Sequence, residues 1–385
     1  MVPRLAGLIV AAAVATGSAQ VGSIPESART AQSYVDEGAR DLQARRNAEA
    51  VAAFRRAIEL DPRSAAAYTG LGSAYYRLGR IPDSVSAFDS ALALDPLRAP
   101  SFINRAISLG TLGRASDALA DLARARQLAS GNAGMLNQIA IVLLDQFNSP
   151  DEALAVYREA AAADPSSAIV FHNIGLLEAK RGRYADAIEG FATAVHLDPS
   201  MRNAWFFLGD SHSRLQHYGE STDAWTHFLA LVPDGPDATA NRAWDYACWG
   251  GHGALAAADA RRFLTVVGWA EPRSSYMALI GYIGLREAGH ADDARLLLDE
   301  AAVKLSPRAW PFPVIRYLRG ALSEHDVLRA ADTNDKETEA RAYIGVRLML
   351  DGNASAAREH LSWVVMHGNH AFREFALATR ALAGM

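Results

Sequence analysis

The chain has 385 residues, of which 50% are apolar and 21% are charged, which excludes a chain too polar to fold. Its net charge of −5 argues against a nucleic-acid surface, because binding phosphates needs an excess of Lys and Arg on one face. The single cysteine, Cys248, excludes an intrachain disulfide and a zinc site built on several cysteines. The sequence therefore predicts a fold that depends on packing alone.

Residues 1–19 have the pattern of an export signal. A short apolar run, Leu5–Ala15, is followed by the small residues Gly17 and Ala19, with cleavage expected after Ala19. The run is too short to span a bilayer, and no later stretch is apolar enough to do so, so no integral membrane domain is expected. We expect a periplasmic or secreted protein in which residues 20–30 form a linker. The alternative is an uncleaved tail on a cytosolic protein.

From residue 31 the sequence repeats with a period of 34 residues. Leu60-Asp61-Pro62 recurs as Leu94-Asp95-Pro96, and Leu197-Asp198-Pro199 continues the series after one unit that is a residue longer. Such a period predicts helix pairs that stack, since no single pair can bury its apolar face alone. In six successive units a small residue precedes a larger one by four positions: Ala50/Phe54, Ser84/Phe88, Ala118/Leu122, Ala153/Tyr157, Ala187/Phe191 and Ser221/Trp225.

These residues and their spacing resemble the tetratricopeptide repeat (TPR), a pair of antiparallel helices. The best single copy contains Trp205, Leu208-Gly209, Ser221, Trp225 and Pro233. The resemblance implies an all-α superhelical solenoid of about eight to nine helix hairpins, with the first helix of each pair lining the concave surface. The predicted units within 31–235 are 31–64, 65–98, 99–132, 133–167, 168–201 and 202–235.

After residue 235 the repeat pattern weakens. Residues 236–274 are predicted to form a degenerate helical hairpin, and 275–385 further TPR-like units. Trp310-Pro311-Phe312-Pro313 interrupts helix formation, with two short helices expected near 314–320 and 323–331. A final capping helix is expected over Phe372–Leu382.

Two stretches near the C-terminus, Glu339–Gly345 and His367–Leu377, are similar to the last repeat and cap of NlpI-like periplasmic TPR lipoproteins of bacteria. That resemblance implies an adaptor that docks peptidoglycan hydrolases and proteases in the cell envelope. The sequence departs from the lipoprotein pattern in one respect, because no cysteine follows the leader.

Catalytic motifs do not stand out in the sequence. There is no Gly-x-Ser-x-Gly, no phosphate-binding Gly-x4-Gly-Lys-Ser/Thr and no His-Glu-x-x-His. Cys248 has mostly apolar neighbours, which favours a buried structural role. His212 and His217 miss the spacing of metal ligands on one helix face. We therefore expect no catalytic residue, metal or cofactor, although chemistry hidden in the irregular segment 236–335 is the alternative.

The remaining candidate is the concave groove, which we expect to bind extended peptide or protein partners. Asn104, Gln138 and Asn173 are 34 or 35 residues apart and would form a ladder of amides that pairs with a peptide backbone. The alternative is that these amides satisfy helix caps or face water. The sequence thus favours a non-enzymatic scaffold of the bacterial envelope, with a homo-oligomer as one option. The predicted partner-binding residues are Tyr76, Arg77, Asn104, Asn137, Gln138, His172, Asn173, Lys180, Phe206, Phe207, Asp210 and Arg214.

Overall fold

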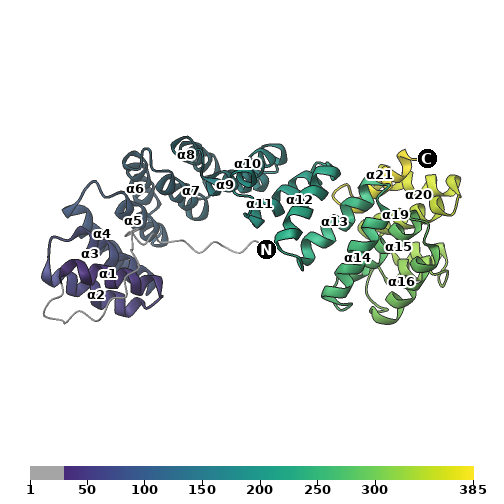
Figure 1. Cartoon of the computed structure of the whole chain (residues 1–385), viewed down its shortest axis with the longest axis horizontal. Coiled ribbons are helices and arrows are strands. Elements are labelled where there is room, and N and C mark those ends of the chain that lie inside the picture. The colour runs from purple at the N-terminus through teal and green to yellow at the C-terminus, as the bar shows by residue number, and fades with distance from the viewer. Residues whose placement is uncertain (1–29) are drawn as a thin grey trace. The chain divides into compact units, whose positions relative to one another are not determined.

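The computed structural model describes residues 30–385, and every regular element in that range is an α-helix (Figure 1). The predicted leader, and the predicted linker apart from Thr30, lie outside the described residues. The all-α prediction is confirmed. No helix of the described residues is long and apolar enough to cross a membrane.

Each of the six predicted repeat units contains two helices. Within a unit the helices pack against each other, as α1 does on α2 and α11 on α12. The bounds are α1 Ala31–Gln43, α2 Asn47–Leu60, α3 Ala65–Arg77, α4 Ile81–Leu94, α5 Ala99–Thr111, α6 Ala115–Leu128, α7 Ala133–Phe147, α8 Pro150–Ala163, α9 Ala168–Lys180, α10 Tyr184–Leu197, α11 Arg202–Arg214 and α12 Tyr218–Leu231.

The Asp-Pro pairs end the second helix of a unit by a side-chain hydrogen bond as well as by the proline. Asp61 follows α2 in an extended conformation, and its Oδ1 accepts the backbone N–H of Arg63 at 3.0 Å. Asp95, Asp164 and Asp198 repeat this turn after α4, α8 and α10. The unit of α5 and α6 lacks the Asp-Pro pair, and its chain turns instead through Gly131, whose φ is +80°.

Aromatic rings from the second helices fill the space within and between units. Phe54 of α2 packs so closely on the next unit that a Cβ added to Gly70 would lie 2.3 Å from its ring. Within their own units, Phe88 crowds Gly72 of α3 and Trp225 crowds Gly209 of α11. Close approach of helix backbones to these rings therefore accounts for the periodic small residues.

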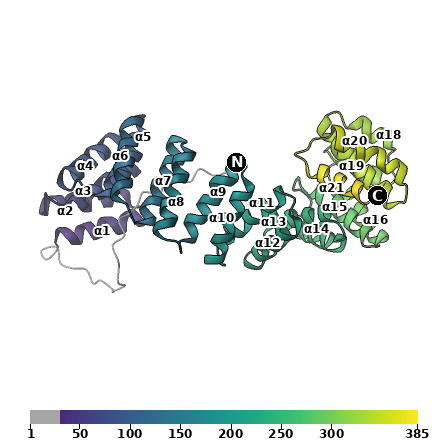
Figure 2. The same ribbon diagram turned by 90° about the horizontal axis from the view of Figure 1, so that it is seen from above.

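Nine further helices follow α12 in the described part of the chain, and α17 and α18 occupy the region where two short helices are expected. The last helix, α21, packs on α19 and α20 (Figure 2), and it also packs on α13, more than 120 residues earlier. The bounds are α13 Pro236–Trp249, α14 Gly253–Val267, α15 Ser274–Glu287, α16 Ala291–Lys304, α17 Phe312–Leu318, α18 Glu324–Ala330, α19 Asn334–Leu350, α20 Ala354–His367 and α21 Arg373–Ala383.

Charged contacts hold α21 against its distant neighbours. Arg373 Nη2 donates to Asn241 Oδ1 of α13 at 2.9 Å, and Arg380 Nη2 lies 2.6 Å from Glu287 Oε1 at the end of α15. The apolar side of α21, including Leu377, is buried in the core shared by α13, α15 and α19. The packing of α21 on helices far away in the sequence is not a property of the repeat, because in a repeat array each unit contacts only its neighbours.

The chain divides into two compact parts, one up to Leu177 and one from Glu178. We call them the N-terminal and C-terminal parts. The sequence places a boundary at 235, where the Asp-Pro punctuation ends, whereas this division falls within α9.

Candidate functional site

Two amides of the predicted groove ladder are buried rather than presented to a partner. The Asn104 residue is 2% exposed, and its Nδ2 donates to Ser73 Oγ of α3 at 3.4 Å. Gln138 is 8% exposed on α7. The expectation that three amides line an open groove is therefore corrected for these two residues.

The repeat explains their burial. Gly70, Asn104, Gln138, Asn173 and Phe207 stand at one repeat position, 34 or 35 residues apart. At the first of these, Gly70 contacts the aromatic ring of the preceding unit, and at the last, Phe207 stacks on Phe191 with ring centroids 5.7 Å apart. At this position Asn104 and Gln138 are buried where units meet, whereas Asn173 stays half-buried.

A pair of half-buried amides does lie on the face formed by the first helices of the N-terminal part. Asn173 Nδ2 of α9 donates to Asn137 Oδ1 of α7 at 2.8 Å. This bond uses one donor and one acceptor, and an amide pair offers further donors and acceptors. His172 beside it is buried, which lowers its pKa to about 4, so the ring is neutral at pH 7.

Tyr76 and Arg77 are half-buried at the end of α3. Tyr76 Oη lies 3.5 Å from Thr111 Oγ1 of α5, and Arg77 Nη1 donates to the Leu42 carbonyl at 2.5 Å. The Arg77 guanidinium therefore joins α3 to α1. Both residues tie neighbouring first helices together on the same face as the amide pair.

In the C-terminal part, the predicted aromatic anchors belong to packing. Phe206 is half-buried, with its ring centroid 5.0 Å from that of Trp225 and 5.4 Å from that of Phe228. Asp210 pairs with Arg214 across one helical turn, at 3.6 Å. Arg214 and Lys180 are exposed. Within the C-terminal part, Phe206 thus packs against its own repeat unit, and Asp210 and Arg214 bind each other.

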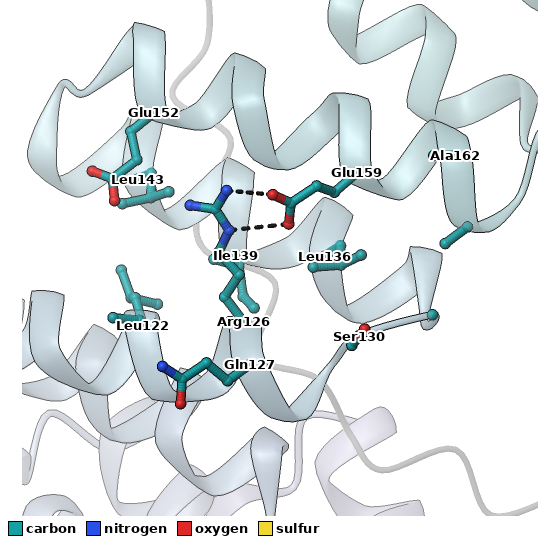
Figure 3. Close-up of a pocket in the computed structure, with 13 residues that line it drawn as sticks. Leu122, Arg126, Gln127, Ser130, Leu136, Ile139, Leu143, Glu152, Glu159 and Ala162 are labelled. Atoms are coloured by element: carbon teal, nitrogen blue, oxygen red, sulfur yellow. Dashed lines mark hydrogen bonds and ion pairs between the residues drawn. The ribbon is translucent and has the colours of Figure 1, made fainter.

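Sequence reasoning missed a cavity of about 800 Å³ between α6, α7 and α8. Leu122, Leu136, Ile139 and Leu143 form its apolar wall (Figure 3). Arg126 of α6 reaches across to Glu159 of α8, with Nε 3.0 Å from Oε2 and a second contact from Nη2 to Oε1. Glu152, Gln127 and Ser130 complete the polar part of its lining.

Two signals in the sequence mark this cavity. Among the six units within 31–235, Leu122 is the one aliphatic residue at the repeat position that otherwise carries an aromatic ring, and the turn after α6 lacks Asp-Pro. Correspondingly, α7 packs less extensively on α6 than α3 does on α2 or α5 on α4. The short side chain and the altered turn together leave an opening between two units.

Cys248 is buried on α13, and burial raises the pKa of its thiol to about 12. The thiol is therefore protonated at neutral pH and is not a reactive nucleophile. Within residues 30–385 no three His, Cys, Asp or Glu side chains are grouped so that they would hold a metal ion.

The sequence profile of the tetratricopeptide repeat matches residues 35–99, 103–168 and 172–243, which is more than half of the chain. The chain belongs to the tetratricopeptide repeat family. Its members typically act as scaffolds for protein–protein interaction, and this TPR chain is assigned that general role. A search of curated proteins finds no match.

Solved TPR structures share the fold. The C-terminal part of a TPR protein from Cytophaga hutchinsonii is 14% identical, with a TM-score of 0.52, covering 63% of this chain and 98% of its own. PilF of Pseudomonas aeruginosa is 20% identical (TM-score 0.42; 55% and 95% covered). YrrB, described as having an unusual peptide-binding site, is 18% identical (TM-score 0.38; 48% and 95% covered). The resemblance to NlpI-like lipoproteins is not shown by these matches.

Proposed function

We propose that this TPR chain is a scaffold that binds an extended segment of a protein partner on the first-helix face of its N-terminal part. The observation that carries the proposal is the half-buried amide pair Asn137–Asn173, which joins two successive first helices. An extended backbone presents one N–H and one C=O per residue, and amide side chains complement both groups.

Neighbouring groups on this face support the same assignment. Tyr76 and Thr111 place hydroxyls between α3 and α5, so polar side chains continue from unit to unit. His172 is neutral, which leaves hydrogen bonding as the main means of recognition near the amide pair. Affinity would come from backbone hydrogen bonds, with the partner's side chains adding selectivity.

Replacing both amides by alanine tests this proposal. Each partner hydrogen bond lost should cost about 1 kcal/mol, so Asn137→Ala/Asn173→Ala should weaken partner binding about thirtyfold. Crosslinking pull-downs with the parent and the variant, quantified by mass spectrometry, measure the loss partner by partner. The matched control is Ser86→Ala/Ser90→Ala on α4, which removes two exposed hydroxyls from a second helix. Equal capture by parent, variant and control would show that the amide face is not the binding surface.

We also propose that the protein acts in the cell envelope after export, and that a second copy of the chain is among the partners to be tested. Support for export comes from the apolar run Leu5–Ala15 followed by Gly17 and Ala19. The mature chain should then begin at Gln20. Intact-mass measurement of the protein from fractionated cells checks this, and retention of Met1 in a cytosolic fraction would contradict it.

A further inference from the structure

We propose that the cavity between α6, α7 and α8 is a second binding site, which takes an aromatic side chain of a partner protein next to a basic residue. It is lined by residues of α6, α7, α8 and the turn after α6, and its lining shares no residue with the amide pair. The inference is therefore independent of the function proposed above.

The shape of the site calls for a ring. At the repeat position of Leu122, the other five predicted units carry rings that are at most 2% exposed: Phe54, Phe88, Tyr157, Phe191 and Trp225. The ring of Phe54 lies against both its own unit, at Gly38, and the next one, at Gly70. Leu122 has no ring, and the junction that follows it holds the cavity. An aromatic group from outside would supply the contacts that the chain itself makes at its other junctions.

The cavity is larger than one aromatic side chain, so we expect it to bind more of the partner than a single ring. A volume of about 800 Å³ exceeds that of one aromatic side chain and lies within the range of pockets that enclose whole small ligands. Its apolar wall comes from α6 and α7, while its polar lining comes from α6, α8 and the turn after α6 (Figure 3). A ring buried on the apolar side would leave the adjoining peptide backbone and the next side chain beside the polar groups.

The charge of the site selects the neighbouring residue. Three charged side chains line it, Arg126, Glu152 and Glu159, so the lining has an excess of one negative charge. The Arg126 guanidinium is already bound by both oxygens of Glu159. Glu152 forms no short-range ion pair within the described residues and interacts with Arg126 through charge alone, so its carboxylate can pair with a further cation. A lysine or arginine adjacent to the partner's aromatic residue would complete the pairing.

Short peptides provide the test. We expect N-acetyl-Phe-Arg-amide to bind the full chain with millimolar affinity, measured by saturation-transfer NMR on the peptide. N-acetyl-Ala-Arg-amide, without the ring, and N-acetyl-Phe-Glu-amide, with the opposite charge, should each bind at least about tenfold more weakly. Absence of binding by the Phe-Arg peptide at several times that concentration would overturn the proposal, as would equal binding of all three. Tighter binding of phenylethylamine would assign the cavity to a small aromatic amine instead of a protein segment.

Filling the cavity from within is the matching mutational test. Leu122→Phe restores the ring of the other units and should reduce binding of the Phe-Arg peptide at least about tenfold. Leu119→Phe, the same change at an exposed position of α6, should leave it unchanged. If Leu122→Phe lowers helicity, Ala162→Trp blocks the cavity from α8 instead. If a folded variant with the cavity filled bound the Phe-Arg peptide as well as the parent does, the proposed site would be wrong. Asn137→Ala/Asn173→Ala should not change the binding of this peptide.

Discussion

Gly284→Ala is expected to destabilise the C-terminal part by about 3 kcal/mol, because the added methyl group would overlap backbone atoms of a neighbouring helix. A Cβ at Gly284 of α15 would lie 2.4 Å from the Gly253 carbonyl oxygen and 2.9 Å from the Ala257 backbone nitrogen of α14. Both atoms belong to the backbone, so relief requires the two helices to separate. The core of the C-terminal part runs through this crossing.

Tryptophan fluorescence measures this effect selectively. All seven tryptophans lie between Trp205 and Trp363, so urea denaturation followed by fluorescence monitors the C-terminal part alone. The control is Gly219→Ala on α12, where the nearest atoms would be 3.4 Å away and alanine suits a helix better than glycine. That variant should be as stable as the parent or slightly more so. If Gly284→Ala and the control unfolded at the same midpoint urea concentration, α14 and α15 would not cross as closely as the structure shows.

The repeat units were predictable because their signals are local and recur. Asp61 and its counterparts end helices by a hydrogen bond to the residue two positions on, which depends on sequence alone. Small residues such as Gly72 are recognisable because the ring that crowds them belongs to the same unit. That ring, Phe88, is itself marked by the small residue Ser84 four positions before it. Repetition of these features made the helix pairs unambiguous.

The groove was harder to predict because helical periodicity does not distinguish an open face from a junction between units. Asn104 and Gln138 have the polarity of a binding surface, yet they occupy the position that Gly70 and Phe207 use for packing. Comparison across units carries that signal, since an aromatic residue at the same position indicates contact with the preceding ring. Polarity alone therefore does not tell whether a residue at this position is buried, as Asn104 and Gln138 are, or half-buried, as Asn173 is.

Features that join distant segments, or that depend on the spacing of helices, do not follow from the repeat pattern by itself. The packing of α21 on α13 joins segments more than 120 residues apart, and it depends on specific pairs such as Arg373 with Asn241. The cavity depends on how far α7 stands from α6, which follows from the combined effect of Leu122 and the altered turn. Each residue is visible in the sequence, but its consequence is geometric.

Glu374→Gln is expected to remove a pH dependence of stability in the C-terminal part. Glu374 of α21 is 4% exposed, and its Oε1 accepts the Tyr343 hydroxyl at 2.9 Å. Burial, together with the nearby charge of Glu339, raises the pKa of Glu374 from 4.5 to about 7. Burial also raises the pKa of Glu339, which accepts from Trp310 Nε1 at 2.6 Å and so joins this acidic cluster.

The direction of the effect follows from which state holds the proton. Below about pH 4.5 both the folded and the unfolded chain are protonated at Glu374, and its contribution is complete. As the pH rises to about 7, the unfolded chain releases its proton first, so the free energy of unfolding falls, by about 3 kcal/mol in total. Above that pH both states are ionised and the loss is constant.

Glutamine keeps an oxygen that accepts the Tyr343 hydroxyl but carries no charge. The variant should therefore match the parent near pH 4.5 and exceed its stability by about 3 kcal/mol at pH 8, measured by fluorescence-monitored urea denaturation. Asp292→Asn on α16, which removes an exposed carboxylate from the same part, should follow the parent across this range. If the free energy of unfolding depended on pH in the same way for Glu374→Gln and the parent, Glu374 would be ionised in the folded protein at neutral pH. In that case Arg373, beside it in the sequence, would have to stabilise the buried charge, although its guanidinium lies 3.9 Å from the Asp245 carboxylate and donates to Asn241.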